Sequence, residues 1–98
     1  MKNYTEIDWS TGKTIVIDFR SDTCGPCRQV AKIIDGMDSD KADFYECSID
    51  EDGTEEMMEK YAIRTVPTLV FIKDGAVVAR NVGATTADKI NEILDSIA

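Results

Sequence analysis

The chain has 98 residues, a formal net charge of −8 at pH 7, and a composition that is 43% hydrophobic and 31% charged. A chain of this length buries one core, so we expect a single domain spanning residues 1–98. The composition is ordinary for a globular protein, and no apolar run is long enough to cross a membrane. The acidic charge argues against a nucleic-acid partner, because phosphates are neutralised by clustered Lys and Arg, and it favours a monomer.

The start of the chain and its cysteine content narrow the location and the chemistry. Met1–Glu6 lacks the basic-then-apolar pattern of a secretory signal, so we expect a cytoplasmic protein. The chain has three cysteines and no histidine. Cys–His and Ser–His catalysis are therefore excluded, and three thiols alone make a poor closed zinc site. A disulfide scaffold would show more cysteines in an even number. For the Cys24–Cys27 pair we expect redox chemistry and no metal.

Two strands joined by a helix are expected in the first half of the chain. Residues 14–19 form a short, β-branched, nearly continuous apolar run, typical of a central strand covered on both faces. A helical pattern begins around Cys24 and is closed by Gly36 and the polar residues 38–40; its apolar side carries Val30, Ile33, Ile34 and Met37. Residues 42–49 alternate as a second strand, with one face formed by Tyr45, Cys47 and Ile49. A right-handed crossover would join these elements as a βαβ unit.

Two further helices are expected. Thr54 precedes an acidic first turn, and the short helix that follows carries Met57, Met58 and Tyr61, with both methionines interpreted as packing residues. Thr85 or Thr86 caps the last helix, whose apolar residues recur at helical spacing: Ile90, Ile93, Leu94 and Ile97.

A β-hairpin completes the expected fold. Asp74-Gly75 lies between the apolar runs 68–72 and 76–79, which is a strong hairpin signal. The order of elements predicts an α/β protein with a four-stranded mixed sheet and helices on both faces. The pattern also allows a short fifth strand near Tyr4–Ile7.

The cysteine pair is suited to thiol–disulfide exchange, which needs an attacking thiolate and a second thiol to resolve the mixed disulfide. Cys24 would lie at a helix N-terminus, where free N–H groups and the macrodipole lower the pKa of a thiol. Pro26 suits the first helical turn, and Gly25 permits close approach of a substrate backbone. Cys27, one turn further along, should be less exposed and act as the resolving thiol.

Several residues have a plain structural interpretation beside the functional one. Cys24 and Cys27 could be ordinary cysteines or half of a metal site, although the Gly-Pro dipeptide and the preceding strand favour redox chemistry. Asp18 is either a buried carboxylate with a raised pKa or a strand-end residue facing solvent. Cys47 reads as a small core residue rather than a regulatory thiol. Trp9 is expected to anchor the N-terminal segment against the sheet.

Four motifs, taken together, resemble the thioredoxin family in order and spacing: Ile17-Asp18-Phe19, Cys24-Gly25-Pro26-Cys27, Val66-Pro67-Thr68 and Val82-Gly83-Ala84. The resemblance covers nearly the whole chain after residue 13. It implies a thioredoxin-like fold with a four- to five-stranded sheet and a shortened N-terminus. It also implies a protein-disulfide reductase that acts on disulfide-containing target proteins and needs no bound cofactor. A thioredoxin reductase or another thiol donor would regenerate the dithiol.

The resemblance further implies roles for residues outside the cysteine pair. Asp18 would be the buried carboxylate that exchanges a proton with Cys27. Pro67 would follow a cis peptide bond and face the dithiol, and the backbone of Val66 would pair with the bound substrate. Gly83 would form a flat floor beside that groove.

The chain departs from the family pattern around the expected site. Thr23 stands where Trp is usual, and Arg20 stands where another aromatic residue is usual. Glu46 matches a position on the next strand that commonly holds a basic residue, and Lys32 a position often held by proline. These departures bear on partner choice and redox potential rather than on the exchange chemistry.

Two rival functions stay open at this point. A less reducing potential would make the protein a disulfide oxidase or isomerase. Alternatively, the domain could be an adaptor that binds a partner in the groove around Pro67 and Gly83.

Overall fold

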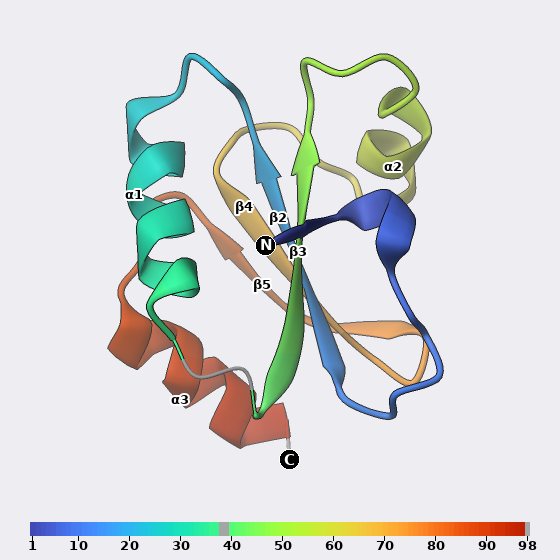
Figure 1. Cartoon of the computed structure of the whole chain (residues 1–98), viewed down its shortest axis with the longest axis vertical. Coiled ribbons are helices and arrows are strands. Elements are labelled where there is room, and N and C mark those ends of the chain that lie inside the picture. Colours follow the sequence, from blue (N-terminus) through green and yellow to red (C-terminus); the bar gives the residue numbers. More distant parts are fainter. Residues whose placement is uncertain (38–39, 98) are drawn as a thin grey trace.

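The computed structural model describes residues 1–37 and 40–97, so Asp38 and Ser39, which were expected to help close the first helix, lie outside the described residues. A five-stranded sheet has the strand order β1-β3-β2-β4-β5. Its strands are β1 (Lys2–Asn3), β2 (Thr14–Arg20), β3 (Ala42–Ser48), β4 (Thr68–Lys73) and β5 (Ala76–Val82). The helices are α1 (Gly25–Asp35), α2 (Glu55–Lys60) and α3 (Ala87–Ile97). Helices α1 and α3 lie together on one side of the sheet and α2 lies apart from them (Figure 1).

The first strand lies earlier than expected. Residues 2–3 form β1, parallel to β3, whereas Tyr4–Glu6 is a turn of 3-10 helix. Asn3 explains the difference, because its side chain accepts a hydrogen bond from the Thr5 N–H at 3.1 Å and its own N–H donates to the Glu6 carboxylate at 3.3 Å. This capping box favours a helical turn over an extended strand.

Strand β2 is central and buried on both faces, as its apolar run predicts. One face contributes to a core cluster whose buried members are Ile15, Ile17, Phe19, Tyr45, Cys47, Tyr61, Ile63, Val70 and Ile72, with Met57 and Met58 packed against it. The opposite face joins α1 and α3 in a second cluster, made of Val16, Val30, Ile34, Ala42, Leu69, Phe71, Ile90 and Leu94. Because strand residues alternate between faces, Asp18 shares the face of Val16, which α1 and α3 cover.

The connections bring three chain segments to one end of the sheet. Strand β2 is parallel to β3 and antiparallel to β4, and β4 is antiparallel to β5. The last residues of β2 and β5 therefore lie beside the first residue of β4, where Thr68 pairs with Phe19 and with Val82. The segments after β2, before β4 and after β5 consequently meet at this end.

The predicted hairpin is present. Asp74 and Gly75 have φ values of 53° and 81°, the left-handed conformations that a two-residue hairpin turn of this kind requires. A bulge between Phe71 and Ile72 shifts the register of β4 against β5. Strand β5 lies at the edge of the sheet, and most of its residues are exposed.

Trp9 does not anchor the N-terminal segment in the way the sequence predicts. Its side chain is 53% exposed and belongs to neither core cluster. It borders a pocket that Ile15 and Ile72 of the sheet also line.

None of the helices within residues 1–37 and 40–97 has the length and the apolar composition that a membrane span requires.

Thr86, rather than Thr85, caps α3. Its hydroxyl accepts a hydrogen bond from the Lys89 N–H at 3.1 Å, and its carbonyl accepts one from the Ile90 N–H at 3.0 Å. We expect Thr86→Ala to lower the free energy of unfolding by about 1 kcal/mol, measured by urea denaturation. Thr85→Ala is the matched control, because the Thr85 hydroxyl has no hydrogen-bond partner among the described residues and its loss should be nearly neutral. Equal destabilisation by both substitutions would contradict the assignment.

Candidate active site

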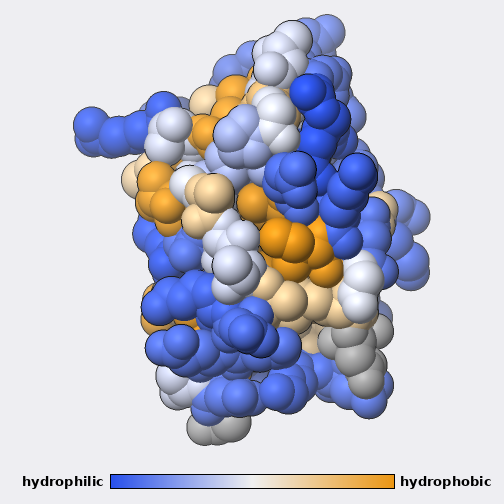
Figure 2. Space-filling model, turned by 90° about the vertical axis from the view of Figure 1, so that its left-hand side faces the viewer, coloured by the Kyte–Doolittle hydropathy of each residue, from blue (hydrophilic) through white to orange (hydrophobic). Residues whose placement is uncertain are grey.

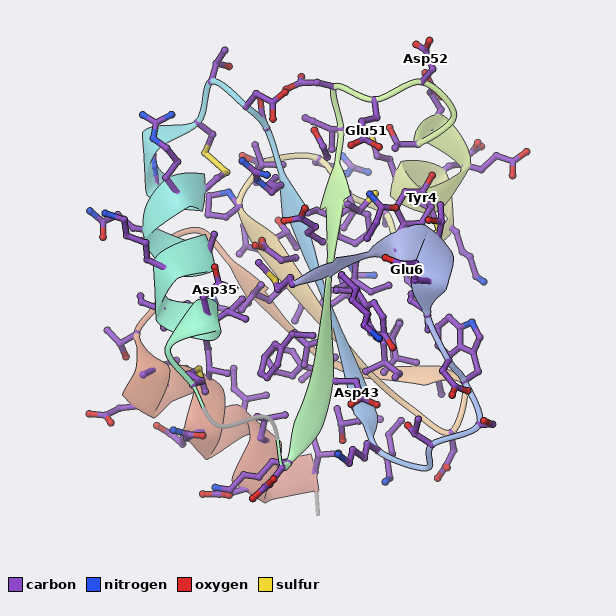
Figure 3. The ribbon with its side chains drawn as sticks, in the orientation of Figure 1. Tyr4, Glu6, Asp35, Asp43, Glu51 and Asp52 are labelled. Atoms are coloured by element: carbon purple, nitrogen blue, oxygen red, sulfur yellow. A yellow bond between two sulfur atoms is a disulfide. The ribbon has the colours of Figure 1, made fainter. Side chains whose placement is uncertain are left out.

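The two cysteines of the CxxC segment form a disulfide at the start of α1. Cys24 is the N-cap, with an extended backbone (φ −97°, ψ 108°), and Pro26 lies in the first turn, where its missing N–H is not needed. The Cα atoms of Cys24 and Cys27 are 5.2 Å apart, within the range that a disulfide requires. The bond is visible as the yellow link at the top of α1 (Figure 3). The helix thus places both sulfurs at the end of the sheet where β2 finishes.

The two sulfurs differ in exposure and in hydrogen bonding. The side chain of Cys27 is fully buried, whereas Cys24 is partly exposed. The sulfur of Cys24 accepts a hydrogen bond from the Cys27 N–H at 3.1 Å. When the disulfide is reduced, this donor and the helix N-terminus favour negative charge on Cys24. An incoming disulfide can therefore reach Cys24 more easily than Cys27.

Asp18 belongs to β2 and is buried two residues before the end of that strand. Its side chain has no exposure, and neither carboxylate oxygen has a hydrogen-bond partner among the described residues. Burial raises the pKa of Asp18 from 3.8 to about 7, and the negative charges of Glu46 and Asp35 act in the same direction while Arg20 opposes them. The solvent-facing alternative for Asp18 is therefore wrong. A carboxyl group with this pKa can both accept and release a proton near neutral pH.

The segment before β4 and the turn after β5 are joined at the same end. The peptide bond between Val66 and Pro67 is cis, as the family resemblance implied. The N–H of Gly83 donates to the Pro67 carbonyl at 2.8 Å, and Gly83 has a φ of 90°, a conformation that side chains disfavour. Pro67 is buried, whereas Val66 is partly exposed. The fold thus brings the Val66–Pro67 segment, Gly83 and the cysteine pair to one end of the sheet.

The comparison with known proteins decides the family. The family model described as Thioredoxin matches residues 2–96. The chain belongs to the thioredoxin family.

Individual thioredoxins align over most of this chain. The thioredoxin of Mycoplasmoides gallisepticum is 33% identical over 94 residues, which cover 94% of each protein. Thioredoxin-1 of Saccharomyces cerevisiae is 38% identical over 77 residues, covering 76% of this chain and 73% of that protein.

Solved thioredoxin structures share the fold. The X-ray structure of Fasciola hepatica thioredoxin superimposes with a TM-score of 0.77 at 36% identity, over 87% of this chain and 81% of that one. A mutant thioredoxin from Halobacterium salinarum gives a TM-score of 0.82 at 28% identity, over 98% of this chain and 86% of that one. These matches confirm the predicted thioredoxin-like fold. Together with the cysteine pair at disulfide distance, the family identifies the chain as a thiol–disulfide oxidoreductase.

Two of the residues that were expected to depart from the family pattern, Arg20 and Glu46, form an ion pair. The register of β2 and β3 pairs Asp18 directly with Glu46. The guanidinium of Arg20 lies 3.7 Å from the Glu46 carboxylate and 3.9 Å from that of Asp22. The positive charge near the buried carboxylate therefore comes from Arg20 on the same strand, and Glu46 on the neighbouring strand is its partner.

Asp50 supports the loop before Cys24, a role that the sequence analysis missed. Its carboxylate accepts hydrogen bonds from the Ser21 hydroxyl at 3.0 Å and from the Asp22 N–H at 2.8 Å. The available signal was the position of Asp50 just after the strand 42–49, because the carboxyl ends of parallel strands meet at one edge.

The predicted core role of Cys47 is confirmed, since its side chain is fully buried and burial raises its pKa to about 11.

Proposed function

We propose that this thioredoxin-family protein reduces disulfides in target proteins, with Cys24 as the nucleophile and Cys27 as the resolving thiol. The observation that carries the assignment is the contrast between the two sulfurs, of which Cys24 is accessible and Cys27 is buried. A target disulfide must approach the attacking thiolate in line, which only an accessible sulfur permits.

The exchange proceeds in two displacements. The Cys24 thiolate attacks one target sulfur, which forms a mixed disulfide and releases the other target sulfur as a thiolate that takes a proton from water. The thiol of Cys27 then passes its proton to Asp18, and its thiolate attacks the sulfur of Cys24. The second target sulfur leaves and is protonated. The target gains two electrons, and the protein is left with the Cys24–Cys27 disulfide that the structure contains.

Asp18 is suited to the proton transfer because its pKa of about 7 leaves part of the population ionised at neutral pH. It is buried on the face of β2 that α1 covers, and Cys27 is buried on α1. A carboxylate in this position has no competing hydrogen bond from the described residues. We therefore assign Asp18 as the proton acceptor and later donor of the resolving step.

The target polypeptide would bind across the end of the sheet. The backbone of Val66 would pair with it as an added strand, while Pro67 and Gly83 form the floor and Gly25 and Pro26 the rim. The hydrogen bond between Gly83 and Pro67 supports a rigid floor.

The protein would act in the cytoplasm, as a monomer, in electron transfer and redox homeostasis. The electrons would come from a thioredoxin reductase or another thiol donor by the same thiol exchange, so no bound cofactor is required. Because Thr23 and Arg20 stand near the cysteine pair where the family resemblance leads us to expect aromatic residues, we expect a thioredoxin reductase from another organism to reduce this protein slowly.

Insulin reduction tests the proposal. With dithiothreitol as the donor, the wild-type protein should shorten the delay before reduced insulin B chains precipitate, measured by turbidity. A variant with both Cys24→Ser and Cys27→Ser should behave like dithiothreitol alone. If the wild-type protein forms and loses its disulfide but leaves the insulin rate unchanged, general disulfide reduction is wrong for this chain.

A further inference from the structure

A pocket beside the disulfide is lined by two positively charged side chains. It lies between the outer face of α1 and the segment after β5, has a volume of about 540 Å³, and is lined by Gly25, Pro26, Arg28, Gln29, Lys32 and Ala84. Gly25 and Pro26 are the residues between the two cysteines, so the pocket adjoins the reacting sulfurs. Figure 2 views the side of the molecule that α1 and α3 cover, where hydrophilic residues lie between several smaller apolar areas.

The charged residues that line this pocket are both cations, although the chain as a whole has a net charge of −8. Arg28 and Lys32 are four residues apart on α1 and therefore project from the same side of the helix. Both side chains are exposed. Within residues 1–37 and 40–97, neither forms an ion pair with a carboxylate at 4.0 Å or less.

Arg28 is held against the active-site segment. One guanidinium nitrogen donates to the Asp22 carbonyl at 3.4 Å. Another lies 3.9 Å from the position that a Cβ atom on Gly25 would occupy. The side chain is thus folded back toward the cysteines, with N–H donors left to bind an anion, and the N-terminus of α1 adds partial positive charge nearby.

The neighbouring carboxylates are already engaged. Asp22 lies 3.9 Å from Arg20, and Asp50 accepts two hydrogen bonds from the loop before Cys24. These acidic groups therefore do not neutralise Arg28, and the charge available to a bound polypeptide on this side of the disulfide is positive.

We propose that this pocket binds an acidic side chain of the target, Asp or Glu, located a few residues from the target disulfide. The inference rests on the proposed function, because it names the class of disulfide substrate that the same site prefers. The target carboxylate would accept hydrogen bonds from the guanidinium of Arg28 and form an ion pair with the ammonium group of Lys32. The pocket thereby selects polypeptides with an acidic residue beside the reactive cysteine.

The test compares three disulfide peptides that differ only in the flanking residue, which is Glu, Gln or Lys. The second-order rate constant for oxidation of the pre-reduced protein is measured for each peptide at about 0.15 M salt, where the Debye length is about 8 Å. At this ionic strength the overall negative charge of the protein repels the acidic peptide only weakly. We expect the Glu peptide to react about three- to tenfold faster than the Gln peptide, as two exposed charge contacts allow.

The double variant Arg28→Gln, Lys32→Gln should reduce this ratio to within about twofold of unity. A change in the reactivity of Cys24 would alter both rates and leave the ratio unchanged. The matched control is Lys13→Gln, Lys41→Gln, which removes the same charge at the opposite end of the sheet, where β2 and β3 begin, and should keep the wild-type ratio.

Two results separate the possible failures. If all peptides are reduced but the Glu peptide has no advantage, or the double variant keeps that advantage, the acidic-substrate inference is overturned and the reductase proposal stands. If the protein reduces none of the three peptides, the proposed function itself fails and the inference fails with it.

Discussion

Cys27→Ser is expected to stop the reaction at the mixed disulfide and accumulate a covalent complex between Cys24 and the target. The exposed sulfur of Cys24 can still attack, but the buried position now holds a hydroxyl that cannot displace the target sulfur. Turnover of insulin should fall to the rate of dithiothreitol alone. Non-reducing electrophoresis and mass spectrometry of the protein mixed with a disulfide peptide would show an adduct that dithiothreitol releases.

Cys24→Ser is the matched control for this experiment. It should lose turnover equally but form no adduct, because Cys27 is fully buried and a target disulfide does not reach it. An adduct of similar yield in both variants would contradict the assignment of nucleophile and resolving thiol. Cys47→Ala in both backgrounds removes the third thiol, which is buried with its pKa raised to about 11 and should not contribute.

Asp18→Asn is expected to stabilise the oxidised protein at pH 8. The wild-type protein should lose stability as the pH rises from 4 to 7, and the variant should lack most of this loss. The folded-state pKa of Asp18 is about 7, against 3.8 for an unperturbed aspartate, so the folded protein holds a proton that the unfolded chain releases in this window. Stability is therefore fully present below about pH 4 and falls as the pH rises to about 7. At about 1.4 kcal/mol for each pKa unit, the difference corresponds to roughly 4 kcal/mol as an upper figure.

Urea denaturation of the wild-type and variant proteins at pH 4 and pH 8 measures this effect. The variant should exceed the wild type by roughly 2–4 kcal/mol at pH 8 and match it more closely at pH 4. The control is Asp52→Asn, which neutralises an exposed carboxyl and should leave the pH dependence unchanged. A wild-type stability that is flat between pH 4 and 7 would show that Asp18 is not a buried group with a raised pKa.

The same variant should slow disulfide exchange while it stabilises the fold. Without the carboxylate, the Cys27 thiol loses its proton acceptor, and we expect the resolving step at pH 7 to slow by about ten- to a hundredfold. The initial attack by Cys24 should change less, so the mixed disulfide should become detectable by rapid acid quench. Unchanged lifetimes of the mixed disulfide in the variant would remove Asp18 from the proton transfer.

The sequence by itself determined the features that depend on neighbouring residues. The apolar run at 14–19 predicts β2, and Asp74-Gly75 predicts the hairpin, because each pattern expresses a local backbone preference. The CxxC segment likewise places both cysteines at a helix start, since two intervening residues and an early Pro26 suit the first turn. These backbone preferences act over a few residues, so the local amino-acid sequence is enough to predict the elements.

Contacts between distant segments were decided only by the tertiary structure. The sequence was compatible with either a buried or a solvent-facing Asp18. The packing of α1 and α3 over β2 buries it. Trp9 was expected against the sheet, but it is 53% exposed and belongs to neither core cluster. The hydrogen bond from Arg28 to the Asp22 carbonyl depends on the path of a long side chain, and the pairing of Arg20 with Glu46 depends on strand register. Burial and electrostatics depend on every element that packs around a group, so local sequence patterns do not determine them.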